Sequence, residues 1–187
     1  MEAKASSKSK IYVLAMTAVM AAVIAAISPF AIPIGPISIT LCTLALYFSP
    51  YILGWKGASV ATLVYILLGM VGMPVFSKFQ GGLGVLMGPT GGYILGYVPM
   101  VVLVGLVIKL APQNRVLQFL GMIGATAVLY VFGTAWYMIL SGNDLAFAMK
   151  WCVVPFIPLD LVKMAIAMVL GPLLRERLVK AGIDPEV

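Results

Sequence analysis

The chain has 187 residues, of which 63% are hydrophobic and only 10% are charged, and its formal net charge at pH 7 is +6. Soluble domains carry about a quarter charged residues, so this composition excludes an ordinary soluble protein. Four long stretches contain no Lys, Arg, Asp or Glu: residues 11–55, 57–77, 79–108 and 116–143. A membrane-spanning helix needs about 20 predominantly apolar residues. The sequence therefore predicts an all-α, multi-spanning membrane protein.

Proline and glycine clusters and charged residues set the boundaries of the predicted spans. We place six spans at about residues 11–28, 37–54, 58–74, 92–110, 116–140 and 153–174. A single membrane domain then covers residues 11–175, between an N-terminal tail of residues 1–10 and a C-terminal tail of residues 176–187. The first apolar run could instead be a secretory signal, but it is longer than a usual signal core and leads into another hydrophobic segment.

Basic residues fall unequally on the two sides of the predicted bundle. With six spans both termini lie on one side, and nine Lys and Arg residues lie there with them, against Lys78 and Lys150 on the other side. By the positive-inside rule we expect both termini in the cytoplasm. The net charge then reflects topology and the anionic lipid surface. We expect no nucleic-acid partner, because no basic patch is interleaved with aromatic residues.

Missing motifs limit the chemistry further. The chain has no His, no Gly-Lys dipeptide to end a phosphate-binding loop, and two Cys residues without C-x-x-C spacing. Asp160 is the single carboxylate within a predicted span. We therefore expect no catalytic residues, no ATP hydrolysis, no metal site and no cofactor.

A glycine-rich loop precedes the fourth predicted span. Six of the thirteen residues from Gly81 to Tyr93 are glycines. Glycine lets the backbone approach a ligand closely, and Thr90, Gly91 and Gly92 stand at a helix start, where amide groups lack helical partners. The pattern indicates either hydrogen-bond donors for a ligand or an outer turn with a close helix contact.

Two charged residues, Asp160 and Lys163, stand three positions apart on one face of the last predicted span. Either charge alone in hydrocarbon costs at least ~2.5 kcal/mol on insertion scales. The pair predicts either an ion pair that orders the bundle or a ligand site near the outer membrane surface.

Small residues repeat every four positions in the first span, at Ala18, Ala22 and Ala26. This spacing lets another helix approach closely. It does not distinguish an internal helix contact from a surface for a partner protein.

Four stretches together carry a family resemblance. They are Pro33-Ile34-Gly35-Pro36 with Ile39-Thr40-Leu41, the G-M-V-G-M-P-V-F stretch of residues 69–76, the G-P-T-G-G-Y-I-L-G-Y stretch of residues 88–97, and the P-F-I-P-L-D-L-V-K stretch of residues 155–163. In this order they resemble the BioY family, the biotin-specific S-components of energy-coupling-factor (ECF) transporters, over roughly residues 11–175. One departure is Cys42, where the family commonly has Gln after Thr-Leu.

The resemblance implies a six-helix S-component bundle in the plasma membrane of a prokaryote, with biotin captured on the outer side. It also implies three partner subunits: a transmembrane coupling subunit and two ABC-type ATPases. The expected substrate-binding residues are Asp160, Lys163, Tyr93, Gly91, Gly92, Thr90, Gly82 and Phe79. We further expect Pro33, Ile34, Gly35 and Pro36 to form a lid over the site, and Ala18, Ala22 and Ala26 to contact a partner subunit.

Other classes of protein stay open at this point. An ion-coupled secondary permease would use Asp160 as a titrating group. An S-component for another vitamin would keep the architecture and change the pocket. A structural membrane protein would bind no small ligand. The short chain with one polar pair favours a binding subunit.

Overall fold

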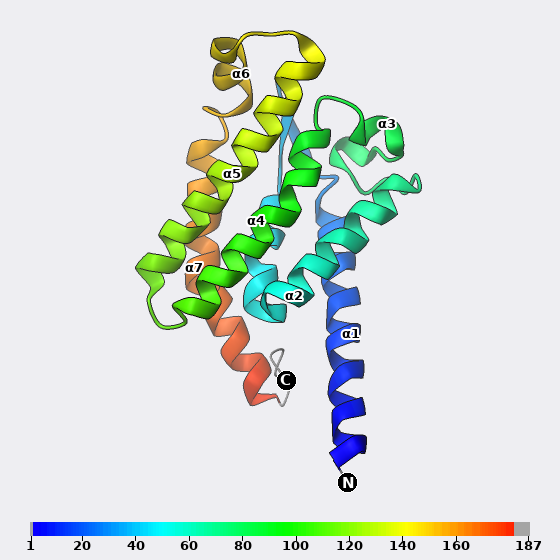
Figure 1. Cartoon of the computed structure of the whole chain (residues 1–187), viewed down its shortest axis with the longest axis vertical. Helices are drawn as coiled ribbons and strands as arrows, with labels where there is room; N and C mark the ends of the chain where they lie inside the picture. The colour runs from blue at the N-terminus through cyan, green and yellow to red at the C-terminus, as the bar shows by residue number, and fades with distance from the viewer. Residues whose placement is uncertain (1, 182–187) are drawn as a thin grey trace.

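The computed structural model describes residues 2–181, with the side chains from residue 11 onward. Within this range seven α-helices are present: α1 (Glu2–Ile27), α2 (Cys42–Met70), α3 (Leu83–Leu86), α4 (Gly91–Leu110), α5 (Arg115–Ser141), α6 (Leu145–Cys152) and α7 (Ile157–Lys180). A hairpin of β1 (Ala31–Ile34) and β2 (Ile37–Thr40) and a short 3-10 turn, η1 (Ser77–Phe79), complete the elements. Helix α1 begins and α7 ends at the same end of the elongated molecule (Figure 1).

Helix α2 is one assigned element with a sharp break inside it. Gly54 has non-helical dihedral angles, φ 65° and ψ 176°, which a residue with a Cβ adopts only at a cost. The break falls between the second and third predicted spans, and the two halves of α2 run in different directions (Figure 1). The predicted count of six spans is nevertheless not confirmed. Among the described residues four helices, α2, α4, α5 and α7, are long and apolar enough to cross a membrane.

The hairpin corrects the predicted start of the second span. We expected a helix from residue 37, but Ile37–Thr40 is strand β2, which pairs antiparallel with Ala31–Ile34. The alternation of Ile and Ser or Thr in this strand suits a half-buried β-ribbon. Gly35 has φ +71° in the connecting turn, and this conformation suits glycine. Helix α2 therefore begins only at Cys42.

The last predicted span also differs from the structure at both ends. Residues 153–156 form a turn, and α7 begins at Ile157 with Pro158 in its first turn, where the missing N–H of proline costs nothing. The helix then continues to Lys180, into the region that we assigned to a tail. Helix α6, ahead of the turn, was not predicted. The rest of the predicted C-terminal tail, residues 182–187, lies outside the described residues.

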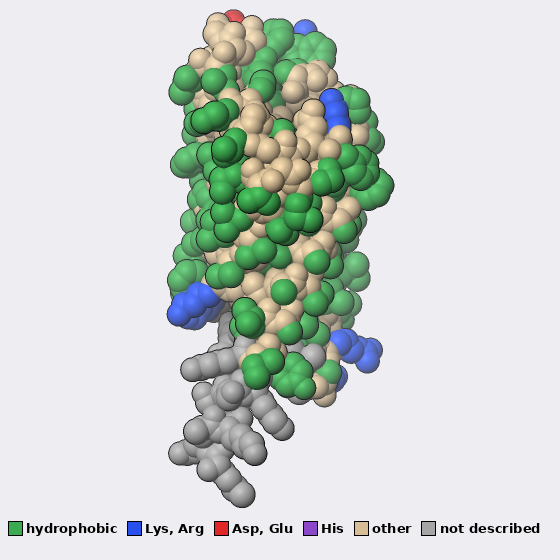
Figure 2. All heavy atoms as spheres, turned by 90° about the vertical axis from the view of Figure 1, so that its right-hand side faces the viewer, with side chains coloured by type: hydrophobic (Ala, Val, Ile, Leu, Met, Phe, Trp, Pro, Cys, Tyr) green, Lys and Arg blue, Asp and Glu red, His purple; other side chains and the backbone are tan. Residues whose placement is uncertain are grey.

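The surface of the bundle is largely hydrophobic along its length, and Lys and Arg side chains lie toward its ends on the face that Figure 2 shows. This distribution is the one expected for helices surrounded by lipid. The chain is thus a mostly helical, multi-pass membrane protein.

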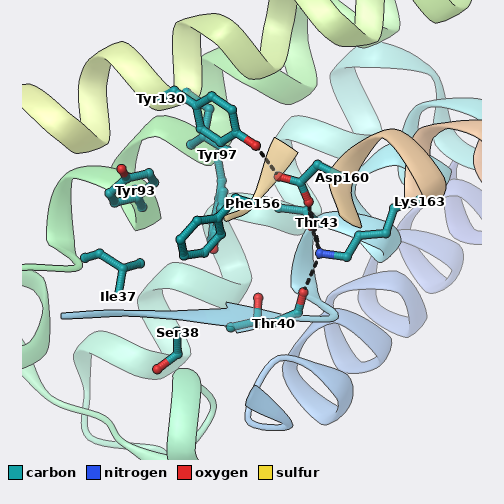
Figure 3. A pocket seen from close by; sticks show the side chains of 11 residues that line it. Ile37, Ser38, Thr40, Thr43, Tyr93, Tyr97, Tyr130, Phe156, Asp160 and Lys163 are labelled. Carbon is teal, nitrogen blue, oxygen red and sulfur yellow. Dashed lines mark hydrogen bonds and ion pairs between the residues drawn. The ribbon is translucent and has the colours of Figure 1, made fainter. Parts of the chain in front are cut away.

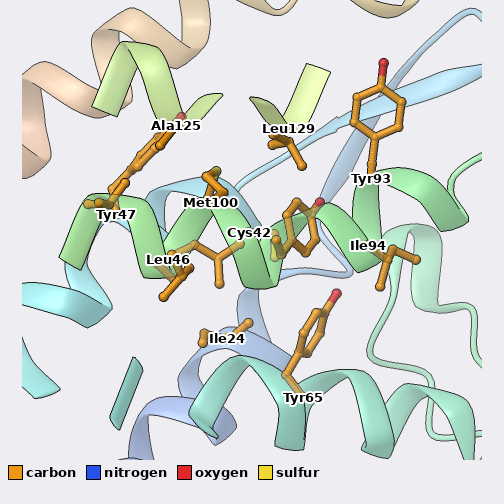
Figure 4. Close-up of a cluster of buried hydrophobic side chains, with 14 of the residues drawn as sticks. Ile24, Cys42, Leu46, Tyr47, Tyr65, Tyr93, Ile94, Met100, Ala125 and Leu129 are labelled. Carbon is orange, nitrogen blue, oxygen red and sulfur yellow. The ribbon is translucent and has the colours of Figure 1, made fainter. Parts of the chain in front are cut away.

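The interior combines apolar side chains with tyrosines. Tyr47, Tyr65 and Met100 are fully buried between α2 and α4, and Figure 4 shows them around Cys42 and Leu46. Several glycines let the helices approach one another. A Cβ at Gly105 would collide with Trp55, and a Cβ at Gly171 would collide with the Tyr51 ring.

Candidate functional site

A cavity lies between strand β2, the first turns of α4 and α7, and the middle of α5. Its free volume in this conformation is about 30 Å³, and it is partly open to solvent. Its walls are Ile37, Ser38, Thr40, Thr43, Tyr93, Tyr97, Leu129, Tyr130, Phe156, Asp160 and Lys163. Six parts of the chain contribute: strand β2, helices α2, α4, α5 and α7, and the turn before α7 (Figure 3).

The ion pair is the most polar feature of this cavity. Asp160 is 3% exposed and Lys163 is 8% exposed, and Lys163 Nζ lies 3.0 Å from Asp160 Oδ1. The ammonium also donates to the carbonyl oxygen of Thr40 at 2.8 Å and to Thr43 Oγ1 at 2.9 Å. Lys163 thus ties the end of strand β2 to helix α7.

The carboxylate of Asp160 has partners on both oxygens. Thr43 donates to Oδ1 at 3.2 Å, and the Tyr130 hydroxyl donates to Oδ2 at 2.7 Å. Asp160 lies in the first turn of α7, where the positive end of the helix dipole favours a negative charge. The start of α7 at the Pro155–Pro158 segment therefore places the acid at the cavity.

Aromatic side chains form most of the remaining wall. Tyr93, at the start of α4, donates its hydroxyl proton to the carbonyl oxygen of Cys152 at 2.9 Å and lies 3.1 Å from Thr134 Oγ1. Gly133 makes room for the Tyr93 ring, because a Cβ there would overlap it. The side chain of Phe156 points into the cavity between Tyr93 and Thr40 (Figure 3).

Three of the predicted substrate-binding residues come together in the cavity: Asp160, Lys163 and Tyr93. Gly91 and Gly92 do not line it. A Cβ on Gly91 would collide with the backbone of Leu86, and a Cβ on Gly92 would collide with Trp136. These glycines therefore permit the start of α4 to pack closely against Leu86 and Trp136.

The other three predicted binding residues lie nearby but outside the walls. Thr90 is the N-cap of α4. Gly82 has φ +96° and donates its N–H to the Gly69 carbonyl at 2.7 Å. Phe79 is 60% exposed, and its ring stacks edge-to-face on Phe30, with the centroids 5.6 Å apart. This loop thus contacts the base of the hairpin.

The sequence did not single out most of the wall. Ile37, Ser38, Thr40 and Thr43 were assigned to a helix, and Tyr97, Leu129, Tyr130 and Phe156 were not proposed as site residues. Thr43 and Tyr130 carried no recognisable signal, because a hydroxyl in an apolar run is common in membrane helices. The two tyrosines one turn apart at the start of α4, Tyr93 and Tyr97, were the one available hint.

The predicted lid residues form the tip of the hairpin. Pro33 and Ile34 belong to β1, and Gly35 and Pro36 make the turn. A Cβ at Gly35 would stand 3.0 Å from the Trp151 ring, so the hairpin tip reaches helix α6. Strand β2 supplies one wall of the cavity.

The lining of the cavity has the composition of a small-molecule site. A mostly aromatic and aliphatic enclosure with a few convergent polar groups is typical of ligand sites. Within residues 11–181 the side chains show no cluster of His, Cys, Asp or Glu suited to a metal ion. The fold and the cavity together are those of a helical membrane protein with a cavity of ligand-site composition between strand β2 and helices α4, α5 and α7.

Known proteins share both the sequence and the fold. The BioY family model matches residues 1–180. A protein of Lactococcus lactis named biotin transporter BioY2 is 34% identical over 163 residues, which is 87% of this chain and 90% of that protein. The biotin transporter BioY of Thermotoga maritima is 33% identical over 136 residues, which is 73% of this chain and 79% of that protein.

A solved structure gives the same result. The crystal structure at 2.1 Å of the S-component for biotin from an ECF-type ABC transporter superposes with a TM-score of 0.83 at 25% identity, and the match covers 89% of this chain and 92% of that one. The chain belongs to the BioY family, as its motifs predicted.

Proposed function

We propose that the chain binds biotin in the cavity around Asp160 and Lys163 and acts as the biotin-capturing S-component of an ECF-type transporter. The observation that supports this proposal most strongly is a buried, hydrogen-bonded ion pair inside an aromatic cavity, in a member of the BioY family. It is a transport subunit and not an enzyme, in line with its relatives named biotin transporter.

The chemistry of the cavity fits biotin. The ureido ring offers two N–H donors and one carbonyl acceptor, and the sulfur ring and valeryl chain are apolar. Asp160 Oδ2 accepts one hydrogen bond, from Tyr130, so its remaining lone-pair capacity is available to a ligand N–H. Tyr93, Tyr97 and Phe156 offer aromatic faces to the apolar rings.

In this proposal the glycine-rich loop that precedes Tyr93 does not line the cavity but positions residues that do. Thr90, Gly91 and Gly92 bring α4 close to its neighbours and so place Tyr93 at the cavity. Gly82 and Phe79 lie in the segment whose Lys78 N–H donates to the carbonyl of Pro29, just before the hairpin, at 2.9 Å. Biotin entry past this segment would bring both residues near the ligand.

The hairpin tip of Pro33, Ile34, Gly35 and Pro36 acts as the lid. It joins two strands that pair only with each other, so it can move without breaking a larger sheet. Its inner strand already contributes Ile37, Ser38 and Thr40 to the wall. Opening of the hairpin would therefore open the cavity directly.

Energised uptake needs partners, because the sequence has no phosphate-binding loop. We propose a transmembrane coupling subunit and two ABC-type ATPases. The exposed Ala18, Ala22 and Ala26 on α1 offer a small-residue surface for one of them. The charge asymmetry supports cytoplasmic termini in a prokaryotic plasma membrane, with the cavity on the outer side.

The test is a biotin titration of the purified full-length chain and its Asp160→Asn variant. Asn at this position is neutral, so Lys163 is left without a counter-ion. We expect the affinity for biotin to fall at least tenfold, because hydrogen bonds to charged groups contribute about 1.5–3 kcal/mol. The matched control is Asp144→Asn. Asp144 is an exposed helix N-cap, a position where Asn caps equally well. Equal affinity in both variants would refute the assignment of the site.

A further inference from the structure

Thr43 is a buried residue in the first turn of α2, at the side of the cavity where the two charges meet. Its hydroxyl oxygen accepts a hydrogen bond from Lys163 Nζ at 2.9 Å and donates its proton to Asp160 Oδ1 at 3.2 Å. Lys163 Nζ also donates to the same Oδ1 at 3.0 Å. The three polar atoms form a closed triangle that joins α2 to α7 (Figure 3).

The triangle uses the whole donor capacity of the ammonium. A lysine has three N–H donors and no acceptor. The three acceptors around Lys163 are Thr43 Oγ1, Asp160 Oδ1 and the carbonyl oxygen of Thr40. No proton is therefore left for another partner without breaking one of these bonds.

The carboxylate is left with one available side. Oδ1 accepts from both Thr43 and Lys163, whereas Oδ2 accepts only from Tyr130, at 2.7 Å. The oxygen bonded to Tyr130 is turned away from Lys163 (Figure 3). The acceptor capacity of the pair thus lies on Oδ2.

We propose that Thr43 is a positioning residue that sets which charged atom meets the ligand. Its hydroxyl holds Asp160 and Lys163 so that Oδ2 faces the N–H groups of the ligand while the ammonium stays engaged with the protein. This inference rests on the proposed function, because it assigns a role within the biotin site.

Only a hydroxyl meets both demands at this position, because it accepts and donates at once. Valine has nearly the same shape but leaves one proton of Lys163 and one acceptor position of Asp160 without partners in a buried place. The penalty for such unsatisfied groups is high. The pair would turn to recover hydrogen bonds, and Oδ2 would lose its orientation.

The experiment compares biotin affinity in four purified full-length proteins: the unsubstituted chain, Thr43→Val, Thr43→Ser and Thr126→Val. Thr126 is the matched control, because it is a buried threonine whose hydroxyl bonds Tyr47 on α2 and the Met122 carbonyl on its own helix rather than Asp160 or Lys163. We expect Thr43→Val to weaken biotin binding at least about tenfold. Thr43→Ser and Thr126→Val should each stay within about threefold of the unsubstituted chain.

A double-substitution cycle separates positioning from general stability. Tyr130 and Thr43 hold the same carboxylate, so the loss in affinity for Thr43→Val with Tyr130→Phe should be clearly smaller than the product of the two single losses. Independent structural effects would multiply instead, and that result would overturn the inference. Melting temperatures without biotin show that each protein is folded. Thr43→Ala gives a second measure should Thr43→Val not fold.

The outcomes distinguish the two levels of the proposal. Tight binding by the unsubstituted chain together with equal losses for Thr43→Val and Thr126→Val would remove the role of Thr43 and leave the biotin site standing. Absence of biotin binding by the unsubstituted chain would remove the proposed function and the positioning role together.

Discussion

A lysine and an aspartate inside a membrane protein are tolerated when every polar atom has a partner. Five hydrogen bonds connect Asp160 and Lys163 to each other and to Thr40, Thr43 and Tyr130. Among the side chains of residues 11–181, no buried nitrogen or oxygen lacks a partner. Because breaking a buried pair costs several kcal/mol, the pair is held in one geometry, as a selective site requires.

The buried thiol of Cys152 allows a prediction outside the membrane-spanning helices. Burial raises its pKa to about 11, so the reactive thiolate is scarce at pH 8 and appears only as the pH approaches 11. In a Cys42→Ala background, we expect iodoacetamide to label Cys152 at least about 100-fold more slowly than an unfolded chain, since an ordinary thiol has a pKa near 8.5. The rate should rise as the pH is raised toward 10.

Mass spectrometry of timed samples measures this labelling. A rate at pH 8 equal to that of the chain unfolded in denaturant would contradict the burial of Cys152 at the end of α6.

Single residues show what the sequence could and could not predict about the site. Asp160 and Lys163 stood out because charge in an apolar span is costly, and Tyr93 stood out through its place beside the glycines. Thr43 and Tyr130 line the same cavity, yet their importance arises from contacts between α2, α5 and α7 that no local pattern encodes.

At the scale of elements, the hairpin is the part most directly connected to the cavity. Strand β2 forms a wall, and its last residue, Thr40, accepts a hydrogen bond from Lys163 at 2.8 Å. The other end of the hairpin touches Trp151 on α6 through Gly35. Movement of the hairpin therefore changes the ion pair and the rim of the cavity together.

A Gly35→Ala substitution tests the proposed lid. It adds left-handed backbone strain of about 1–2 kcal/mol and a methyl group 3.0 Å from the Trp151 ring. We expect the dissociation rate of biotin to rise about tenfold, which corresponds to about 1.4 kcal/mol, because the hairpin tip no longer docks closely on α6. Displacement of labelled biotin by unlabelled biotin measures this rate.

Gly142→Ala is the matched control for that substitution. Gly142 has φ +69°, close to the +71° of Gly35, but a Cβ there meets no atom within 4 Å. It should lower stability through backbone strain and leave the dissociation rate within about twofold, since Gly142 caps α5 and the added methyl group meets no neighbouring side chain. Equal dissociation rates for the two variants would count against the lid.

The helices were predictable where hydrophobicity and charges marked both ends, as for residues 92–110 and 116–140, which match α4 and α5 within one residue. The hairpin was missed because Ile37–Thr40 runs without a charge into α2. A short apolar segment next to a helix has no distinct period. The position of the α2 break at Gly54 was predicted as the boundary between the second and third spans, because this glycine and the charged Lys56 mark it.

At the scale of the whole molecule, the bundle separates two surfaces. The cavity opens near the hairpin end, whereas Ala18, Ala22 and Ala26 are exposed along α1. The opposite face of α1 is buried, with Met20, Ala21 and Ile24 packed in the core. Among the side chains of residues 11–181 none covers this small-residue stripe, which favours a partner subunit over an internal contact.

Ala18→Leu and Ala22→Leu test this surface. Larger side chains should block close helix approach, so we expect recovery of the coupling subunit and ATPases in a pull-down to fall several-fold while biotin affinity stays unchanged. Ala146→Leu, the same change at an exposed position on α6, is the control. Undiminished recovery with both α1 variants would place the partner surface elsewhere.

The central claim is that this chain alone captures biotin. The most direct measurement is a calorimetric titration of the purified full-length protein with biotin, without partner subunits, ATP or an ion gradient. We predict saturable binding that approaches one biotin per chain and is lost in Asp160→Asn. No saturable binding by the unsubstituted protein, or binding that Asp160→Asn leaves unchanged, would contradict the account.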